Sequence, residues 1–244
     1  MVPELERLIE KSSRLVFFGG AGVSTESGIP DFRSVDGLYH QTFRYPPEYM
    51  LSHTFFVQHT AEFFDFYRKK LIVHGAKPNA AHLRLAALEK EGKCKAVVTQ
   101  NIDGLHQAAG SKTVYELHGS TLRNFCTRCG KFYGVDFIEE AGKQGDGVPH
   151  CTECGGLVKP DVVLYEEGLD EATVNGAVKA ISEADLLIVG GTSLAVYPAA
   201  GLLRYFRGNE LVVINKQPTP ADDSASLVLH MPIGQALGAE AKQE

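Results

Sequence analysis

The chain has 244 residues, of which 44% are hydrophobic and 22% are charged, and its formal net charge is −6. This composition is ordinary for a globular protein, and the length allows one large α/β domain or a main domain with a small inserted one. The acidic balance argues against direct nucleic-acid binding, and no apolar run approaches the roughly 18 residues of a membrane span. The amino terminus is too charged for a signal peptide, so a cytoplasmic location is expected.

The first predicted strand, residues 14–20, runs directly into a glycine-rich turn. That turn contains Gly20, Ala21 and Gly22, with Thr25 shortly after, and backbone amides in such a turn can approach a phosphate. The third glycine of the dinucleotide fingerprint is missing, and no acidic residue closes a second strand about 20 positions on. A glycine turn without a ligand therefore remains an open interpretation of this motif.

The loop after this turn contains Asp31, Phe32 and Arg33, which directly follow a proline. Folding of the loop does not by itself require these three residue types. An arginine beside an aromatic ring on a loop suits a ligand that has both a phosphate and a ring. This continuation favours a ligand-binding turn.

Residues 79–92 predict a helix with a glycine stop, and residues 95–101 predict the buried strand that follows. Three polar side chains, Gln100, Asn101 and Asp103, emerge where this strand ends. Open α/β sheets place their ligands at this end of their strands.

Two histidines follow, and each has two interpretations. His106 either packs or caps a helix, or takes part in catalysis. His118 ends the next predicted strand, residues 113–119, where a neutral imidazole can act as a general base near pH 7. A half-buried structural histidine fits that position equally well. Cys94 is expected to be a buried thiol with no chemical role.

The other four cysteines form two CxxC pairs separated by 21 residues, Cys126 with Cys129 and Cys151 with Cys154. In a reducing compartment such pairs more often bind metal than form disulfides. The spacing is that of a four-cysteine zinc site, and four protein ligands leave no open position for a substrate. The sequence therefore predicts one structural Zn²⁺.

The remaining predicted elements are a helix at 169–184, a strand at 184–193, a helix at 198–208, and strands at 211–215 and 226–231. The predicted strands are hydrophobic almost without alternation, which suits strands that are buried on both faces. The β-α-β alternation predicts an α/β fold with a Rossmann-like, doubly wound parallel sheet.

Polar groups also follow two of these late strands. Gly191, Thr192 and Ser193 offer backbone and hydroxyl donors to a second phosphate or a ribose. Asn215 either bonds a ribose or base or forms a local turn.

Two segments interrupt the alternation. Residues 39–77, with their clearest helix in HTAEFFDFYRKKLIVHG, and residues 124–156 are expected to form a smaller helical and zinc-binding module. The Rossmann-like domain then takes residues 1–38, 78–123 and 157–244.

In combination, these motifs resemble the sirtuin family of NAD-dependent protein-lysine deacylases, in its short bacterial or archaeal form. The resemblance rests on GAGVSTESGIPDFR, TQNIDGLH, the His-Gly at 118–119, the CxxC pairs, GTSL and VIN, and it covers essentially the whole chain. It implies NAD as co-substrate and acetylated-lysine proteins or peptides as partners. A monomer is the expected state. The implied reaction transfers the acetyl group to ADP-ribose and releases nicotinamide and O-acetyl-ADP-ribose. The alternatives are deacylation of longer or acidic acyl groups, or protein ADP-ribosylation.

The resemblance also assigns roles. His118 would be the general base, Asn101 and Asp103 would complete the catalytic set, and the four paired cysteines would bind zinc. Asp103 and Ile102 would form the pocket that receives nicotinamide, with Phe32 near it. The full implied NAD-binding set is Gly20, Ala21, Gly22, Thr25, Asp31, Phe32, Arg33, Gln100, Asn101, Ile102, Asp103, His118, Gly191, Thr192, Ser193, Asn215 and Ile233.

Two positions depart from the family's pattern. Glu166 stands in Tyr-Glu-Glu where the family commonly has Phe-Gly-Glu, which leaves peptide preference open. Lys70 stands where members that favour succinyl or malonyl groups have an arginine after a tyrosine. Because lysine lacks the two-pronged fork that grips a carboxylate, acetyl or longer neutral groups are expected over succinyl.

Overall fold

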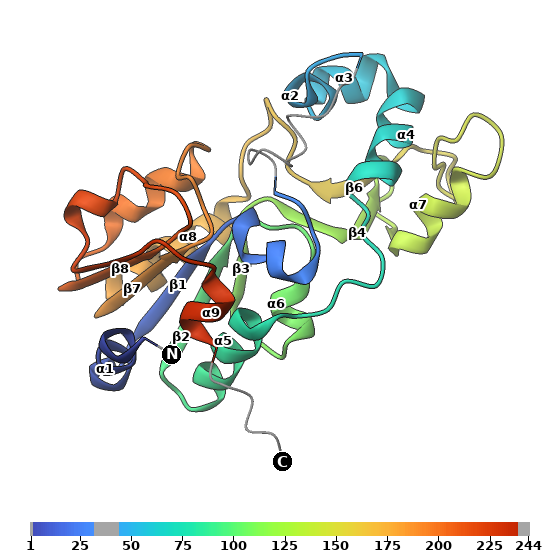
Figure 1. Cartoon of the computed structure of the whole chain (residues 1–244). Helices are drawn as coiled ribbons and strands as arrows, with labels where there is room; N and C mark the ends of the chain where they lie inside the picture. Colours follow the sequence, from blue (N-terminus) through green and yellow to red (C-terminus); the bar gives the residue numbers. More distant parts are fainter. Residues whose placement is uncertain (1, 32–43, 239–244) are drawn as a thin grey trace.

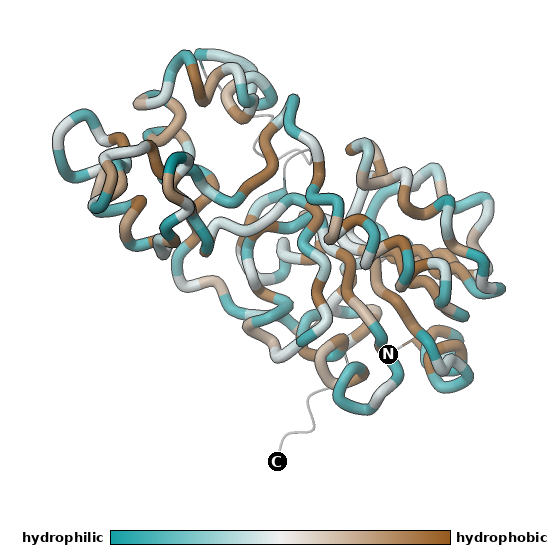
Figure 2. Tube along the Cα trace, turned by 180° about the vertical axis from the view of Figure 1, so that it is seen from behind, coloured by the Kyte–Doolittle hydropathy of each residue, from teal (hydrophilic) through white to brown (hydrophobic). Residues whose placement is uncertain are grey.

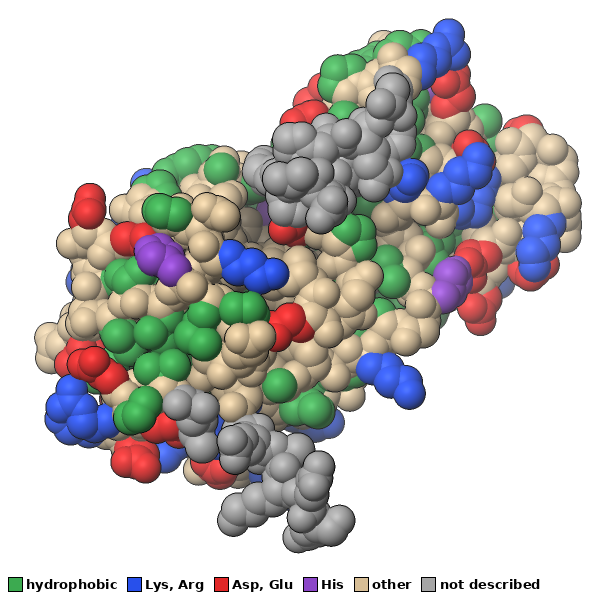
Figure 3. Space-filling model, viewed as in Figure 1, with side chains coloured by type: hydrophobic (Ala, Val, Ile, Leu, Met, Phe, Trp, Pro, Cys, Tyr) green, Lys and Arg blue, Asp and Glu red, His purple; other side chains and the backbone are tan. Residues whose placement is uncertain are grey.

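The computed structural model describes residues 2–31 and 44–238 of the chain. These residues form a larger lobe around a parallel sheet and a smaller lobe of short helices beside a second sheet (Figure 1). On the face shown in Figure 3, basic and acidic side chains are interspersed over both lobes. No helix among the described residues is long and apolar enough to cross a membrane.

The larger lobe contains all six predicted strands, with bounds shifted slightly from those expected. In spatial order they are β3 (Val114–Glu116), β2 (Cys94–Thr99), β1 (Leu15–Gly19), β7 (Leu186–Gly190), β8 (Glu210–Ile214) and β9 (Leu227–Leu229). Every neighbouring pair is parallel. This order confirms the predicted Rossmann-like sheet, and the topological switch point lies between β1 and β7.

Alternate residues of these strands pack against opposite layers of helix, because successive side chains of a strand point to opposite faces. Phe17 belongs to one core and Phe18 to the other. The first layer comprises α1 (Pro3–Lys11), α5 (Ala80–Lys90) and α9 (Ile233–Leu237). The second comprises α8 (Glu171–Glu183) and η4 (Ala199–Tyr205). The strands are accordingly hydrophobic along most of their length (Figure 2).

The segment predicted as a helix at 198–208 is a 3-10 helix, η4. Gly201 lies in its middle, where a glycine disfavours a regular α-helix, and the Gly201 amide donates to the Pro198 carbonyl at 3.0 Å.

The smaller lobe has its own core, built from an antiparallel sheet and four helices. The sheet order is β5 (Phe132–Tyr133), β4 (Gly119–Cys126) and β6 (Val158–Val162). The helices are α2 (Pro47–Met50), α3 (His53–Gln58), α4 (Thr60–Lys70) and α7 (Val135–Ala141). Buried aromatic rings such as Phe55, Phe63 and Tyr67 fill this core. A smaller module of short helices and an antiparallel sheet is therefore present beside the parallel sheet, as predicted.

The connection between the lobes begins at Gly119, directly after His118. Gly119 has a φ of +75°, and a Cβ there would lie 1.9 Å from the Asp161 carbonyl oxygen, so only glycine allows β4 to approach β6 here. Strand β4 extends across the boundary expected between residues 123 and 124, and β6, which was assigned to the Rossmann-like domain, pairs with β4 in the smaller sheet. The division of the chain into domains stays a prediction.

Two buried histidines pack beneath the glycine-rich turn. His82 of α5 accepts a hydrogen bond at Nδ1 from the Asn79 amide at 3.2 Å, and its ring centroid is 4.7 Å from that of His106 in α6 (Leu105–Ala108). His106 also contacts Phe17, with ring centroids 6.0 Å apart. Burial lowers the pKa of His82 to about 4 and that of His106 to about 3. This packing favours the structural interpretation of His106.

The free energy of unfolding should therefore decrease as pH falls below about 6.5, the ordinary histidine pKa. Below about pH 6.5 both imidazoles stay neutral in the folded chain but become protonated in the unfolded chain. The unfolded state therefore binds more protons until the pH reaches the lowered pKa values of the folded state. We expect a loss of about 1 kcal/mol per buried histidine between pH 6.5 and 5.5. Denaturant unfolding of wild type and His106→Leu checks this: the variant should show the shallower pH slope, and equal slopes would contradict it.

Candidate active site

Polar groups from the sequence motifs meet at the carboxyl ends of β1, β2 and β7, beside the switch point of the sheet. The turn after β1 contains the short helices η1 (Ala21–Val23) and η2 (Thr25–Ser27). The Gly22 amide donates to the Gly191 carbonyl at 2.8 Å, and a Cβ on Gly22 would lie 2.8 Å from the Gly191 backbone. Glycine at both positions therefore allows the two turns to touch.

Gln100, which follows β2, connects the ends of β1 and β7 by hydrogen bonds. Its amide nitrogen donates to the Gly19 carbonyl at 3.0 Å, and its side-chain Nε2 donates to Thr192 Oγ1 at 3.1 Å. The predicted polar groups that follow β1, β2 and β7 are thus brought together.

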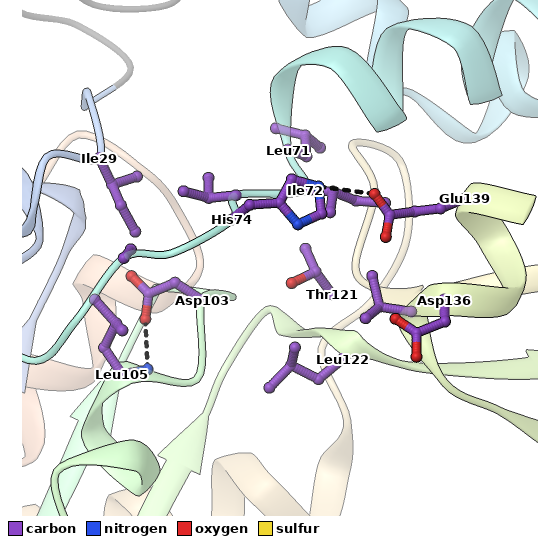
Figure 4. A pocket seen from close by; sticks show the side chains of 13 residues that line it. Ile29, Leu71, Ile72, His74, Asp103, Leu105, Thr121, Leu122, Asp136 and Glu139 are labelled. Carbon is purple, nitrogen blue, oxygen red and sulfur yellow. Dashed lines mark hydrogen bonds and ion pairs between the residues drawn. The ribbon is translucent and has the colours of Figure 1, made fainter. Parts of the chain in front are cut away.

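Asn101 and Asp103 are joined by a third residue, Ser24. Asn101 Nδ2 donates to Ser24 Oγ at 3.1 Å, and Ser24 Oγ donates to Asp103 Oδ2 at 2.6 Å. The other carboxylate oxygen of Asp103 accepts from the Leu105 amide at 2.9 Å (Figure 4). Ser24 is buried, and its part in the site is not predicted from the sequence because no spacing rule singles out a serine in this turn.

His118 is held in one tautomer. Its Nδ1 lies 3.0 Å from the Gln100 carbonyl oxygen. Because a carbonyl only accepts hydrogen bonds, Nδ1 carries the proton and Nε2 is left with its lone pair. Burial lowers the pKa of His118 below the ordinary value, against the opposing effect of the Gln100 bond. The imidazole is therefore neutral at pH 7 and able to accept a proton at Nε2.

Among the described residues, four other candidates make none of these hydrogen bonds: Ile102, Ser193, Asn215 and Ile233. Ser193 is exposed, and Asn215 Nδ2 donates to the Gln217 carbonyl at 2.7 Å. Ile233 is buried in the core of the larger lobe, and Ile102 packs against the core of the smaller one. Asp31 is half-buried, whereas Phe32 and Arg33 lie outside the described residues.

One further link was not expected from the sequence. The carboxylate of Glu26, in η2, accepts a hydrogen bond from the Gly234 amide at 2.6 Å. Glu26 therefore fastens the start of α9 to the glycine-rich turn.

The four paired cysteines converge, and their sulfur atoms all lie within 4.8 Å of one another. The Cys126 and Cys154 sulfurs are 3.4 Å apart, and those of Cys129 and Cys151 are 3.6 Å apart. A tetrahedral zinc with Zn–S bonds of about 2.3 Å places its sulfurs about 3.8 Å apart, so the donor set fits this ion. The Tyr133 hydroxyl donates to Cys151 Sγ at 3.2 Å and lowers the pKa of that thiol to about 6, which favours the thiolate a metal needs.

The model of the Sir2 family matches residues 20–198. The chain belongs to this family, the sirtuins. A Clostridium acetobutylicum protein named NAD-dependent protein deacetylase is 61% identical, over 97% of this chain and 96% of its own length. A Clostridium perfringens protein of the same name is 59% identical, over 97% of each chain.

Solved sirtuin structures share the whole architecture. A complex described as Sir2 with a p53 peptide and NAD⁺ has a TM-score of 0.86 and 40% identity, covering 97% of this sirtuin and 95% of that chain. A Sir2 variant with deacetylated p53 peptide and 3′-O-acetyl ADP ribose has a TM-score of 0.87 and 40% identity, covering 96% and 94%.

Replacing Cys126 with serine should remove most of the bound zinc and lower the melting temperature, because metal binding in such a site is coupled to folding. Metal analysis and thermal unfolding of the purified variant measure both effects. Cys94→Ala is the matched control, since Cys94 is a buried thiol in the other lobe and lies outside the cluster. Full zinc content in Cys126→Ser would contradict the assignment.

Proposed function

We propose that this sirtuin is an NAD-dependent protein-lysine deacetylase. The observation that carries the proposal is the arrangement of His118, whose Nδ1 is held by the Gln100 carbonyl and whose Nε2 is free to take a proton. The names of the most similar relatives, and the peptide and nucleotide in the related structures, support the same activity. The four-cysteine zinc would be structural, since its ligands leave no open position.

The proposed reaction begins with the carbonyl oxygen of acetyl-lysine attacking the anomeric carbon of the nicotinamide ribose, with loss of nicotinamide. His118 Nε2 then takes a proton from the ribose hydroxyls, so that the 2′-oxygen can attack the acyl carbon. A neutral imidazole is suited to this step, and its burial keeps it neutral. The fixed network of Asn101, Ser24 and Asp103 orients the nicotinamide end of the co-substrate without needing to reorganise.

We assign the remaining sites by the same reasoning. The touching turns that carry Gly22 and Gly191 would receive the phosphates, because they bring backbone donors to the switch point of the sheet. Thr192, Ser193 and Asn215 would hold the adenosine half. Gly20, Ala21, Thr25, Asp31, Phe32, Arg33, Gln100, Ile102 and Ile233 complete the proposed NAD site.

The acylated peptide would add as a strand between residues 162–167 and 194–198. Residues 163–167 are already fixed to the smaller lobe, since the Tyr165 amide donates to the Leu51 carbonyl at 3.0 Å and its carbonyl accepts from the His53 amide at 3.0 Å. Glu166 adopts a φ of +76°, which explains why glycine is common there in the family. Its carboxylate accepts from the Thr54 amide at 2.9 Å and the Thr54 hydroxyl at 2.7 Å, which offsets the strain.

We further propose that the enzyme acts as a monomer in the cytoplasm on acetylated proteins. The five free cysteines, four of them grouped as a metal would need, support a reducing compartment.

His118→Ala should reduce deacetylation by about 10²-fold to 10⁴-fold, the usual contribution of a general base. Zinc content and melting temperature should stay near those of wild type. Mass spectrometry of an acetyl-lysine peptide incubated with NAD follows the reaction. Full activity in the variant would remove His118 from its role.

The enzyme should prefer acetyl-lysine to succinyl-lysine. Tyr67 is fully buried among aromatic rings and Lys70 is exposed, and the lysine lacks the two-pronged fork by which an arginine grips a carboxylate. The ratio of kcat/KM on matched acetylated and succinylated peptides tests this, and an equal or higher value for the succinylated peptide would overturn it. Detection of ADP-ribosylated protein in the same assay would favour the transferase alternative.

A further inference from the structure

Two residues other than glycine have a left-handed backbone within the part of the chain that the structure describes. They are Glu166, with a φ of +76°, and Leu194, with a φ of +55°. This conformation costs free energy for any residue with a Cβ, and it persists only where surrounding contacts hold it. The two residues lie on the two segments between which the acylated peptide is proposed to add, 162–167 and 194–198. Strain on both sides of one proposed peptide site points to a role in that site.

Each strained residue bonds to a threonine. The Leu194 amide donates to Thr192 Oγ1 at 3.2 Å, and the Leu194 side chain is buried in a core of the larger lobe. Glu166 is exposed, so no core packing holds it, and its contact with Thr54 is made by the carboxylate. Oε2 of Glu166 accepts from the Thr54 amide at 2.9 Å and from the Thr54 hydroxyl at 2.7 Å. These bonds lower the pKa of the Glu166 carboxyl below its ordinary value, so the group is charged at pH 7.

Thr54 belongs to α3, which is a fixed part of the smaller lobe. The Ser52 side chain caps this helix by accepting from the Phe55 amide at 3.1 Å, and Phe55 is fully buried. The segment that contains Glu166 starts beside the candidate general base, because the Val163 amide donates to the His118 carbonyl at 3.0 Å. The contact between Glu166 and Thr54 therefore fastens a segment that begins at His118 to a rigid helix.

The backbone of Glu166 is the part of this segment that is left for a peptide. The Tyr165 amide and carbonyl already bond to the smaller lobe, and the Leu164 amide and carbonyl bond to Glu167 at 2.9 and 3.0 Å. Among the described residues, none accepts from the Glu166 amide and none donates to the Glu166 carbonyl. Because φ sets the direction of these two groups, the left-handed conformation of Glu166 determines where a peptide backbone can meet them.

We propose that Glu166 is a positioning residue for the acylated peptide, and that its carboxylate, held by Thr54, keeps the Glu166 amide and carbonyl in the direction that the peptide backbone must meet. This inference rests on the proposed deacetylase function. The peptide adds to an edge that is already ordered, so less conformational entropy is lost on binding. Because the contact acts on the backbone of the enzyme, its effect does not depend on the side chains of the peptide.

Glu166→Gly removes the carboxylate and also the strain, because glycine adopts either hand. It should raise the KM for an acetylated peptide about tenfold and leave kcat near that of wild type, as expected for a loss of binding that is equal in the ground state and the transition state. Glu166→Gln keeps an acceptor oxygen for Thr54, so its KM should stay within about twofold of wild type. Thr54→Ala should raise KM on its own but not further in the Glu166→Gly background, since the two residues form one contact.

Asp170→Gly is the matched control. Oδ2 of Asp170 accepts from the Thr173 amide at 2.7 Å and from the Thr173 hydroxyl at 2.8 Å, which is the same pair of bonds at the start of another helix, α8. Asp170 has a φ of −63° and lies outside residues 162–167, so its removal should leave KM as in wild type.

Each KM is measured on two acetylated peptides, one with arginines beside the acetyl-lysine and one with neutral residues there. A similar rise on both peptides in Glu166→Gly is the expected result. A rise confined to the arginine peptide, or an equal rise in Glu166→Gln, would overturn the positioning role, because Glu166 would then act by its charge. An unchanged KM in both Glu166→Gly and Thr54→Ala, or a raised KM in Asp170→Gly, would also overturn it. A wild-type enzyme that deacetylates neither peptide would instead overturn the proposed function.

Discussion

Gly22 and Gly191 meet backbone to backbone, and the rest of the candidate site depends on that contact. The hydrogen bond between them is 2.8 Å long, and any side chain at Gly22 would collide with the opposite turn. Their approach holds the turns that follow β1 and β7 together, and beside them Gln100 reaches Thr192 and Asn101 reaches Ser24. A side chain at Gly22 would push the turns after β1 and β7 apart.

The site also lies where the chain passes from one lobe to the other. His118 follows β3 of the parallel sheet and precedes β4 of the small sheet, so both sheets position its backbone: the Leu117 amide donates to the Thr99 carbonyl and the Val163 amide to the His118 carbonyl. Ile102 packs into the core of the smaller lobe, and its carbonyl accepts bonds from the amide and the hydroxyl of Thr121. A change in the angle between the lobes would therefore move Asn101, Asp103 and His118 relative to one another.

The sequence predicts the parts of this structure that depend on local pattern. The apolar runs predicted all six parallel strands, and the spacing of the cysteines predicted the cluster. Helix α1 was not predicted, although Leu5, Leu8 and Ile9 have the spacing of a buried helix face. Ser24 could not be predicted, because its two hydrogen bonds join residues that are distant in the chain and meet only after the sheet has formed.

Histidine shows most clearly why residue type alone did not decide function. His82, His106 and His118 all have a pKa lowered by burial, so all three are neutral at pH 7. Their partners differ: within the part of the chain that the structure describes, neither ring nitrogen of His106 has a hydrogen-bond partner, nor does Nε2 of His82, and all three atoms are buried. His118 instead has Nδ1 fixed by a carbonyl and is only half-buried, so a substrate can approach Nε2. A lowered pKa makes an imidazole a base only where a substrate proton can reach it, and among these three histidines His118 best meets that condition.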